Sequence, residues 1–295
     1  MWRRITGGAA LVLGVAAFLL AAELTLRSRY RHRVLADAAG PGDEVTLVAL
    51  GDSIVAGTPG SATVAWPALL AGRLQAAYPQ VAWRVVNAGQ PGDTAPQGYL
   101  RFEAALAGTR PRAVLIAFGL NDCHPARYGM DRWFELEIPT GLGEYSYLWR
   151  AIQVRIRRWG RSIGWLPQPQ PERGRVPLPR TSAQGFAAAL TALVRRSREL
   201  GARPVLLTMT PLANAQAADM RAWQESCLLY NAIIRDQAAR WRVPLVELAT
   251  GLPAQGLGPD GVHLTPAGQD WVAAQVSRQL AESGFWARLI AEGKG

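Results

Sequence analysis

The residues Val45-Thr46-Leu47-Val48-Ala49-Leu50 run directly into Gly51-Asp52-Ser53-Ile54-Val55-Ala56-Gly57. A short apolar run rich in β-branched residues is typical of a buried strand, and the Gly-Asp-Ser that follows indicates a tight turn. In open α/β sheets ligands bind at the carboxyl ends of the strands, so the hydroxyl of Ser53 is a candidate nucleophile. A plain turn with a serine N-cap explains the same residues, because this triplet occurs by chance in roughly one such chain in ten. A catalytic role for Ser53 therefore requires a base and oxyanion donors elsewhere in the chain.

Apolar runs and helical patterns alternate along the chain after this stretch. Short apolar runs predict five strands and the 3.6-residue spacing predicts helices between them, which together indicate an α/β fold. The predicted strands cover 45–50, 81–86, 113–118, 204–209 and 243–248, and the predicted helices cover 65–77, 97–107, 186–200 and 219–240.

Two further strands end in residues that suit an oxyanion hole. The strand ending at Val86 runs into Asn87-Ala88-Gly89-Gln90-Pro91-Gly92-Asp93-Thr94, where Gly89 allows a backbone N–H to face a ligand. The next strand ends in Gly119-Leu120-Asn121-Asp122, where the Asn121 carboxamide offers a side-chain N–H. Ordinary turns also use glycine and Asn-Asp pairs. Three successive strand ends thus offer Ser, Gly and Asn.

A candidate base follows the last predicted strand, in Pro259-Asp260-Gly261-Val262-His263-Leu264. Thr265 and Pro266 are typical of a helix N-cap and first turn, so Asp260 and His263 lie in the irregular segment before that helix. If the loop folds back, the carboxylate can orient one ring nitrogen while the other accepts the serine proton. The chain has two other histidines: His32 lies in a basic run, and His124 stays a second candidate because it follows Asn121 closely.

The ordered set of these motifs resembles the SGNH (GDSL-type) serine hydrolases. Ser53, Gly89, Asn121, Asp260 and His263 match Gly-Asp-Ser, the loop glycine, Gly-x-Asn-Asp and Asp-x-x-His in sequence order. The resemblance spans roughly residues 45–280, apart from an insertion. The bacterial thioesterase/lysophospholipase branch is especially similar, through Ala65-Trp66-Pro67-Ala68-Leu69-Leu70, through Val85-Val86-Asn87-Ala88-Gly89 with Gly92-Asp93-Thr94, and through Asp260-Gly261-Val262-His263.

The resemblance implies a three-layer, flavodoxin-like fold with a five-stranded parallel sheet and an esterase site that needs no metal or cofactor. Ser53 would be the nucleophile, His263 the base and then the acid, and Asp260 the residue that orients it. The backbone N–H groups of Ser53 and Gly89, with the Asn121 amide, would hold the oxyanion.

The N-terminal 35 residues predict a membrane anchor or a signal peptide, with a basic juxtamembrane segment. Arg3 and Arg4 precede an apolar run from Ile5 to Ala22, which is about long enough for a slightly short transmembrane helix. No convincing cleavage site follows directly, so we favour an uncleaved anchor. The arginines after the run would hold the catalytic part in the cytoplasm, whereas the charged start and apolar core are an export signature. We expect the catalytic domain to lie on the extracytoplasmic side of the membrane, and a location on the cytoplasmic side stays the alternative.

Residues 36–44 form a predicted linker, and residues 45–295 form the hydrolase domain with a cap-like insertion at 123–180. In the insertion, apolar residues recur at helical spacing from Trp149 to Ile163, with arginines at other positions. Such a basic amphipathic helix is typical either of membrane-surface contact or of a cap that buries its apolar stripe on the domain. The insertion departs from the family branch, and it leaves the choice of acyl group open.

The formal charge of the chain is +10, from 32 basic and 22 acidic residues. Because the arginines gather beside tryptophans and apolar residues, an anionic membrane surface suits them better than nucleic acid. Two cysteines, Cys123 and Cys227, are too few for a metal site or a disulfide framework. Whether they pair is left open by the sequence.

We therefore expect a membrane-associated serine ester hydrolase, similar to lysophospholipases and thioesterases, that acts through an acyl-Ser53 intermediate. A carbohydrate O-acetyl esterase of the cell envelope is the first alternative, since the same residues serve it equally well. An inactive membrane scaffold on the same fold is the alternative from a different class. A nucleotide-binding loop and an α/β-hydrolase elbow both fail, because Gly51 to Gly57 fits neither glycine pattern and Ser53 lacks the Gly-x-Ser-x-Gly context.

Overall fold

The computed structural model describes residues 2–35, 44–57, 65–139, 141, 146–166, 168, 178–213 and 218–292. Side chains at 2–11, 30–35, 218 and 219 lie outside this description, as does most of the predicted linker at 36–44.

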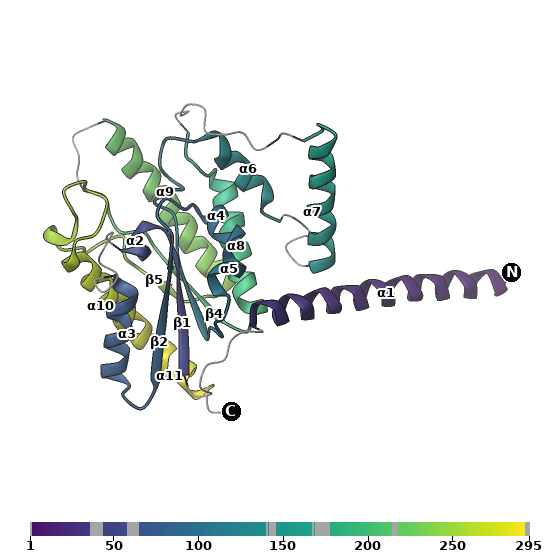
Figure 1. Cartoon of the computed structure of the whole chain (residues 1–295), viewed down its shortest axis with the longest axis horizontal. Coiled ribbons are helices and arrows are strands. Elements are labelled where there is room, and N and C mark those ends of the chain that lie inside the picture. Colours follow the sequence, from purple (N-terminus) through teal and green to yellow (C-terminus); the bar gives the residue numbers. More distant parts are fainter. Residues whose placement is uncertain are drawn as a thin grey trace. The chain divides into compact units, whose positions relative to one another are not determined.

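Five parallel strands form the centre of the larger part of the chain (Figure 1). They are β1 (Glu44–Gly51), β2 (Ala82–Gly89), β3 (Ala113–Ala117), β4 (Arg203–Leu207) and β5 (Leu245–Val246), in the spatial order β2-β1-β3-β4-β5. The register pairs Gly51 with Gly89 and with Ala117, so three strands end side by side. The predicted five-stranded parallel sheet is confirmed.

One face of the sheet is covered by α3 (Trp66–Ala77), α10 (Pro266–Glu282) and α11 (Phe285–Ala291) (Figure 1). Their apolar side chains pack on the side chains that β1 points toward this face, with Trp66 and Trp286 among the largest that are fully buried. Pro67 in the first turn of α3 and Pro266 in that of α10 suit helix starts, since a proline there loses no helical hydrogen bond.

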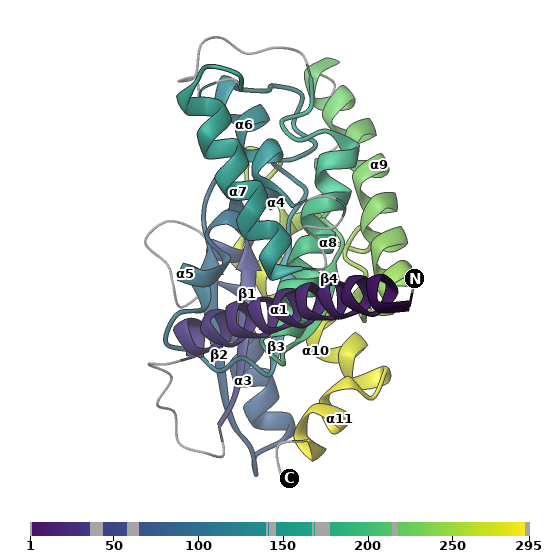
Figure 2. The same cartoon turned by 90° about the vertical axis from the view of Figure 1, so that its right-hand side faces the viewer.

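The other face is covered by α4 (Ala95–Leu100), α5 (Phe102–Leu106), α8 (Ala183–Glu199) and α9 (Ala218–Trp241), and α8 lies beside α9 (Figure 2). Phe102 and Phe186 are fully buried in this layer. The domain therefore has three layers, as predicted, and it buries apolar side chains on both faces of the sheet.

Several predicted elements differ from those observed. The strand expected over 81–86 runs on to Gly89, so Asn87, Ala88 and Gly89 pair with β1 and do not lie in a loop. The helix expected over 97–107 is split into α4 and α5 at Arg101, whose guanidinium reaches the carbonyl oxygens of Ala88 and Gly51 at 3.0 and 2.9 Å. The strand expected over 243–248 is only two residues long, because the backbone N–H of Leu248 donates to the Thr208 hydroxyl at 2.7 Å and not to a strand carbonyl.

The chain divides into two compact units, one of Met1–Ala36 with Pro139–Gln168 and one of Asp37–Ile138 with Pro169–Gly295. The second unit contains the sheet, together with α6 (Gly129–Glu137) at the start of the insertion. The first unit contains α1 (Trp2–Leu35) and α7 (Tyr147–Ser162). Within it, the Glu23 carboxylate accepts hydrogen bonds of 2.9 Å from the backbone N–H groups of Tyr147 and Leu148 at the start of α7.

Among the described residues, no helix carries an apolar stretch of the length that a membrane crossing requires. The predicted transmembrane helix over Ile5 to Ala22 is therefore not supported. Helix α1 continues without a break past Ala22, and Glu23, Arg27 and Arg29 fall within it.

Candidate active site

Ser53 lies at the turn between β1 and the short helix α2 (Ser53–Ala56). The Asp52 carboxylate caps this helix by accepting a 2.9 Å hydrogen bond from the Ile54 N–H. A Cβ on Gly51 would lie 2.4 Å from the carbonyl oxygen of Ala117, so only glycine fits between β1 and β3 at this point. Because Gly51 has no side chain, β1 can pack closely against β3 up to its last residue, and the chain then turns so that Ser53 lies at the edge of the sheet.

The structure brings Ser53, His263 and Asp260 together, although Ser53 and His263 are 210 residues apart in the chain. The Ser53 Oγ lies 3.0 Å from the Nε2 of His263, and the His263 Nδ1 lies 2.6 Å from the Oδ2 of Asp260. The loop that carries Asp260 and His263 ends at Thr265, whose hydroxyl caps α10 by accepting a hydrogen bond from the Gly268 N–H. This arrangement allows the imidazole to accept a proton from Ser53 while the carboxylate orients it.

The surroundings of Asp260 favour its ionised carboxylate. Burial by itself would raise its pKa, but the hydrogen bond from His263 and those from the backbone N–H groups of Val262 and His263 lower the pKa to about 2. The side chains of Asp260 and His263 keep about half of their surface exposed, at 50% and 54%. The pair therefore faces open space, which a substrate can enter.

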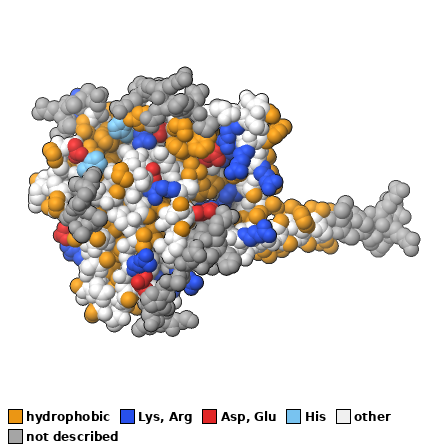
Figure 3. Space-filling model, viewed as in Figure 1, with side chains coloured by type: hydrophobic (Ala, Val, Ile, Leu, Met, Phe, Trp, Pro, Cys, Tyr) orange, Lys and Arg blue, Asp and Glu red, His pale blue; other side chains and the backbone are white. Residues whose placement is uncertain are grey.

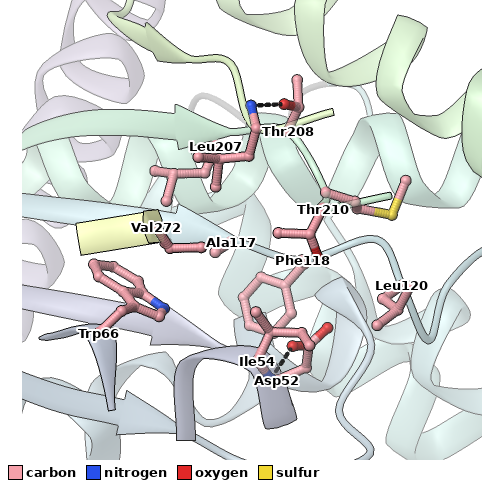
Figure 4. A pocket seen from close by; sticks show the side chains of 12 residues that line it. Asp52, Ile54, Trp66, Ala117, Phe118, Leu120, Leu207, Thr208, Thr210 and Val272 are labelled. Atoms are coloured by element: carbon pink, nitrogen blue, oxygen red, sulfur yellow. Dashed lines mark hydrogen bonds between the residues drawn. The ribbon is translucent and has the colours of Figure 1, made fainter. Parts of the chain in front are cut away.

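Two buried carboxyl groups lie in the turns next to this set. Burial raises the pKa of Asp52 to about 7 and that of Asp122 to about 7. Asp52 borders a cavity of about 20 Å³, which has room for about one water and is lined mostly by apolar side chains such as Trp66 and Phe118 (Figure 4). The low polarity of these surroundings favours the neutral carboxyl group.

The raised pKa of Asp52 predicts that the domain loses stability as the pH rises from about 4 to 7. In that window the folded state holds a proton that the unfolded state has already released, so unfolding is favoured by up to about 4 kcal/mol per carboxyl. Replacing Asp52 with asparagine removes this proton linkage. Urea unfolding at pH 5 and pH 8 should therefore show a smaller loss of stability for Asp52→Asn than for the unchanged protein.

Glu292→Gln is the matched control for this measurement. Its partner Arg203 stays charged throughout the range, and because the pKa of Glu292 is lowered, its linkage lies in the acid range, where stability is lost as the pH falls. Glu292→Gln should leave the difference between pH 5 and pH 8 unchanged. An equal difference for Asp52→Asn and the unchanged protein would contradict the assignment of the linkage to Asp52.

Asn121 follows β3 and contacts the loop after β2. Its Nδ2 donates to the carbonyl oxygen of Asp93 at 3.1 Å, which takes one of the two N–H bonds of the carboxamide. The neighbouring Asp122 is fully buried and accepts from the Ala95 N–H at 3.0 Å. The turn after β3 is thus attached to the start of α4, and this attachment sets the position of Asn121.

Gly89 lies at the end of β2, where a Cβ would come 2.2 Å from the backbone nitrogen of Ala56 in α2. Its N–H donates to the Asn87 carboxamide oxygen at 2.9 Å, so this bond has to open before Gly89 can donate to an oxyanion. Gly92 is the glycine of the loop that follows, with φ +83° and open space where a side chain would point. It precedes Asp93, whose carbonyl Asn121 contacts, so the backbone N–H of Gly92 is an alternative donor that the sequence interpretation missed.

Two arginines that the sequence interpretation also missed hold this loop. Arg101 bonds to the Asp93 carboxylate and to the carbonyl oxygens at the ends of β1 and β2. Arg180, at the end of the insertion, donates to the carbonyl oxygen of Gly92 at 2.8 Å and pairs with Asp131 at 3.0 Å. Proximity of an arginine to a distant carbonyl leaves no periodic signal in a sequence, so neither contact could be inferred from spacing.

His124, the other candidate base, packs its ring against Trp223 of α9, with 4.5 Å between ring centroids. The structure places only His263 within hydrogen-bond distance of Ser53 among the described histidine side chains. The described residues also contain no cluster of three or more His, Cys, Asp or Glu side chains that could hold a metal ion.

A model of the GDSL-like Lipase/Acylhydrolase family matches residues 49–271. The thioesterase 1/protease 1/lysophospholipase L1 of Escherichia coli is 47% identical over 77 residues, which are 26% of this chain and 35% of that protein. The esterase TesA of Pseudomonas aeruginosa is 43% identical over 77 residues, which are 26% of this chain and 37% of that protein. The chain thus spans about a third of the length of the curated relatives it matches.

Solved structures agree on the fold. A catalytic mutant of an acetylxylan esterase from Geobacillus stearothermophilus superposes with a TM-score of 0.53, at 20% identity, over 82% of this chain and 96% of that chain.

Proposed function

Because the chain belongs to the GDSL-like lipase/acylhydrolase family, we propose that it hydrolyses acyl esters or thioesters through an acyl-Ser53 intermediate. One observation carries the proposal: the Ser53 Oγ lies 3.0 Å from the His263 Nε2, and Asp260 holds the other ring nitrogen at 2.6 Å. The geometry supports the following roles for these residues. Ser53 attacks the acyl carbon while His263 accepts its proton, and His263 then protonates the leaving group.

The oxyanion of the tetrahedral intermediate needs donors on the same side of the acyl carbon. We assign this role to the Ser53 N–H, to the Asn121 carboxamide and to one N–H at the end of β2 or in the loop after it. Gly89 supplies that N–H if its bond to Asn87 opens, and Gly92 supplies it otherwise. Water then attacks the acyl-enzyme with His263 as the base, which returns Ser53 to its starting state.

Lysophospholipids and acyl thioesters are the proposed substrates, on the basis of the 77 residues shared with the Escherichia coli thioesterase/lysophospholipase. A carbohydrate O-acetyl ester is the second candidate substrate. Its support is weaker than that for the lipid-type substrates, because the likeness to the acetylxylan esterase concerns the fold alone.

A fluorophosphonate probe tests the reaction class, because it labels a serine whose proton a neighbouring base removes. We expect one label per chain, mapped by peptide mass spectrometry to Ser53; a folded sample that takes up no label would support the inactive scaffold. A series of p-nitrophenyl esters from acetyl to palmitoyl then separates the substrates. A kcat/KM that peaks at medium or long acyl chains supports the lipid-type substrate, and a peak at acetyl supports the carbohydrate ester.

We also propose that α7 binds the surface of an anionic membrane. Trp149, Ile156 and Trp159 lie along one side of α7 and are 40%, 48% and 60% exposed, and five arginines lie on the same helix. Basic side chains gather over the surface that α7 forms (Figure 3). Aromatic side chains that enter the headgroup region, flanked by arginines that meet anionic lipid, are the features of an interfacial helix.

Replacing Arg155, Arg157 and Arg158 of the full-length chain with glutamate should weaken its binding to vesicles with 30% phosphatidylglycerol by at least tenfold. Each basic residue near an anionic surface contributes about 1 kcal/mol, and reversal adds repulsion. Co-sedimentation at low and high salt measures the effect, with neutral phosphatidylcholine vesicles as the control. Unchanged binding to the anionic vesicles would leave α7 as a cap only.

An extracytoplasmic location of the catalytic domain is a separate proposal, which a reporter fused to the C-terminus can test.

A further inference from the structure

We propose that Cys123 and Cys227 form a disulfide bond that ties the turn carrying Asn121 to helix α9. The two Sγ atoms lie 2.7 Å apart although the residues are 104 positions apart in the chain. Both cysteines are free and buried, with Cys123 fully inaccessible and Cys227 8% exposed. A disulfide bond is about 2.05 Å long, so its formation needs a movement of less than about 1 Å at the sulfur atoms.

The approach of the two sulfur atoms is held by one direct contact between α9 and the turn and by a second that runs through Thr181. Trp223, Cys227 and Tyr230 are spaced four and three residues apart, so they lie on one side of α9. The Trp223 indole N–H donates to the carbonyl oxygen of Leu120 in the turn at 3.1 Å. The Tyr230 hydroxyl donates to the carbonyl oxygen of Thr181, whose own N–H donates to the carbonyl oxygen of Asp122 in the turn at 3.1 Å. The side of α9 that faces the turn is therefore fixed on both sides of Cys227, and the cysteines are not brought together by a flexible segment.

Only one of the two sulfurs is within reach of a reagent. Cys227 lines a cavity of about 380 Å³ that is also bordered by Leu212, Arg221 and Leu228. Cys123 is enclosed, and its burial raises the pKa of its thiol well above the usual range. A disulfide reagent therefore meets Cys227 first, and Cys123 is placed to resolve the product.

The oxidant is a second disulfide, carried by a small molecule or by a thiol–disulfide oxidoreductase. The Cys227 thiolate attacks one sulfur of that disulfide, which forms a mixed disulfide and releases one thiolate. The Cys123 sulfur then gives up its proton and attacks the Cys227 sulfur, which releases the second thiolate. The protein loses two protons and two electrons, and the oxidant is reduced to two thiols.

The bond would stabilise the site as well as the fold. Cys123 follows Asn121 by two residues, and its N–H donates to the Gly119 carbonyl at 2.8 Å, so the turn from Gly119 to Cys123 is one short closed segment. A cross-link over about 100 residues also removes much of the freedom of the unfolded chain. We expect the oxidised protein to melt about 10 °C above the reduced protein.

The test uses the full-length chain equilibrated with oxidised or reduced glutathione, quenched with acid, unfolded and alkylated. After oxidation we expect no alkylated cysteine and a peptide that links Cys123 to Cys227; after reduction we expect two alkylated cysteines. Melting temperatures of the two forms are compared in the same experiment. Hydrogen–deuterium exchange should slow on oxidation in the peptides that cover 119–124, and this effect is specific to a link at that turn.

Cys227→Ser is the matched variant, because it removes the accessible sulfur and keeps a side chain of similar size. Its melting temperature should be the same in both glutathione buffers. The unchanged protein carries the decisive comparison, so the test does not depend on the folding of this variant. Two alkylated cysteines after oxidation, a glutathione adduct on Cys227 alone, a disulfide between two chains, or equal melting temperatures of the two forms would each overturn the proposal.

Discussion

Alanine in place of Ser53 is expected to lower kcat/KM for a p-nitrophenyl ester by about 10⁴-fold or more. The substitution removes the Oγ that lies 3.0 Å from the His263 Nε2, and with it the atom that would form the acyl-enzyme. His263, Asp260 and the oxyanion donors remain, so the variant should keep only the part of the rate enhancement that binding and charge stabilisation supply. Because α2 is capped by the Asp52 side chain and not by Ser53, the fold should be unaffected.

Three measurements make this result decisive. Stopped assays give kcat/KM, intact mass spectrometry of quenched samples detects the acyl-enzyme of the unchanged protein, and the melting temperature shows that the variant is folded. Ser283→Ala is the matched control. Ser283 lies at the C-terminal end of α10, whereas His263 lies just before the N-terminal end of the same helix. The control should keep its full rate. A Ser53→Ala variant that retains the rate of the unchanged protein would rule out the acyl-serine route.

The sheet and the turn at Ser53 could be predicted from the sequence because they depend on short-range patterns. An apolar run such as Val45 to Leu50 is typical of a strand that is buried on both faces, as in a parallel sheet covered by helices, and Gly51 is required where β1 closes on β3. The pairing of Asp260 with His263 is local as well, since the two residues are three positions apart in one loop. These features needed no knowledge of the distant parts of the chain.

Long-range contacts decide most of the features that the sequence did not predict. The helix expected over 97–107 is divided at Arg101, whose guanidinium binds the carbonyl oxygen of Gly51 at the end of β1, 50 residues earlier in the chain. One missed contact is local: the Asn87 carboxamide oxygen accepts a hydrogen bond from the Gly89 N–H, which a glycine motif by itself cannot reveal. The approach of Cys123 to Cys227 depends on how α9 packs against the turn after β3.

The N-terminal segment shows a different limit. Hydropathy from Ile5 to Ala22 predicts a membrane crossing, which the described part of the chain does not support. The same helix runs on through charged residues, and the Glu23 carboxylate caps α7 through two backbone N–H groups. A window of hydropathy treats a helix as isolated, whereas this carboxylate has partners that come from a segment more than 120 residues away.

Replacing Asn121 with alanine is expected to lower kcat by about 10²- to 10³-fold while KM changes little, the second-largest effect that we predict. The reason lies in when the interaction forms. A carboxamide N–H that meets the oxyanion binds the tetrahedral intermediate more strongly than the ground-state ester, so its loss raises the barrier without weakening substrate binding. The bond from Asn121 to the Asp93 carbonyl takes one N–H of the carboxamide, and the same substitution removes it, so part of any effect could come from the loop.

Asn121→Asp separates the two roles, because it keeps the size of the side chain but replaces the donor with a negative charge that repels the oxyanion. If Asn121 is an oxyanion donor, Asn121→Asp should be slower than Asn121→Ala, and both variants should lose affinity for a tetrahedral boronate inhibitor in proportion to their loss of kcat/KM. If Asn121 only positions the loop, both variants should show a lower melting temperature and a raised KM, and inhibitor affinity should follow KM. The proportionality between inhibitor affinity and kcat/KM therefore decides whether the Asn121 amide acts on the reacting atoms or only on the Asp93 carbonyl that it contacts in the structure.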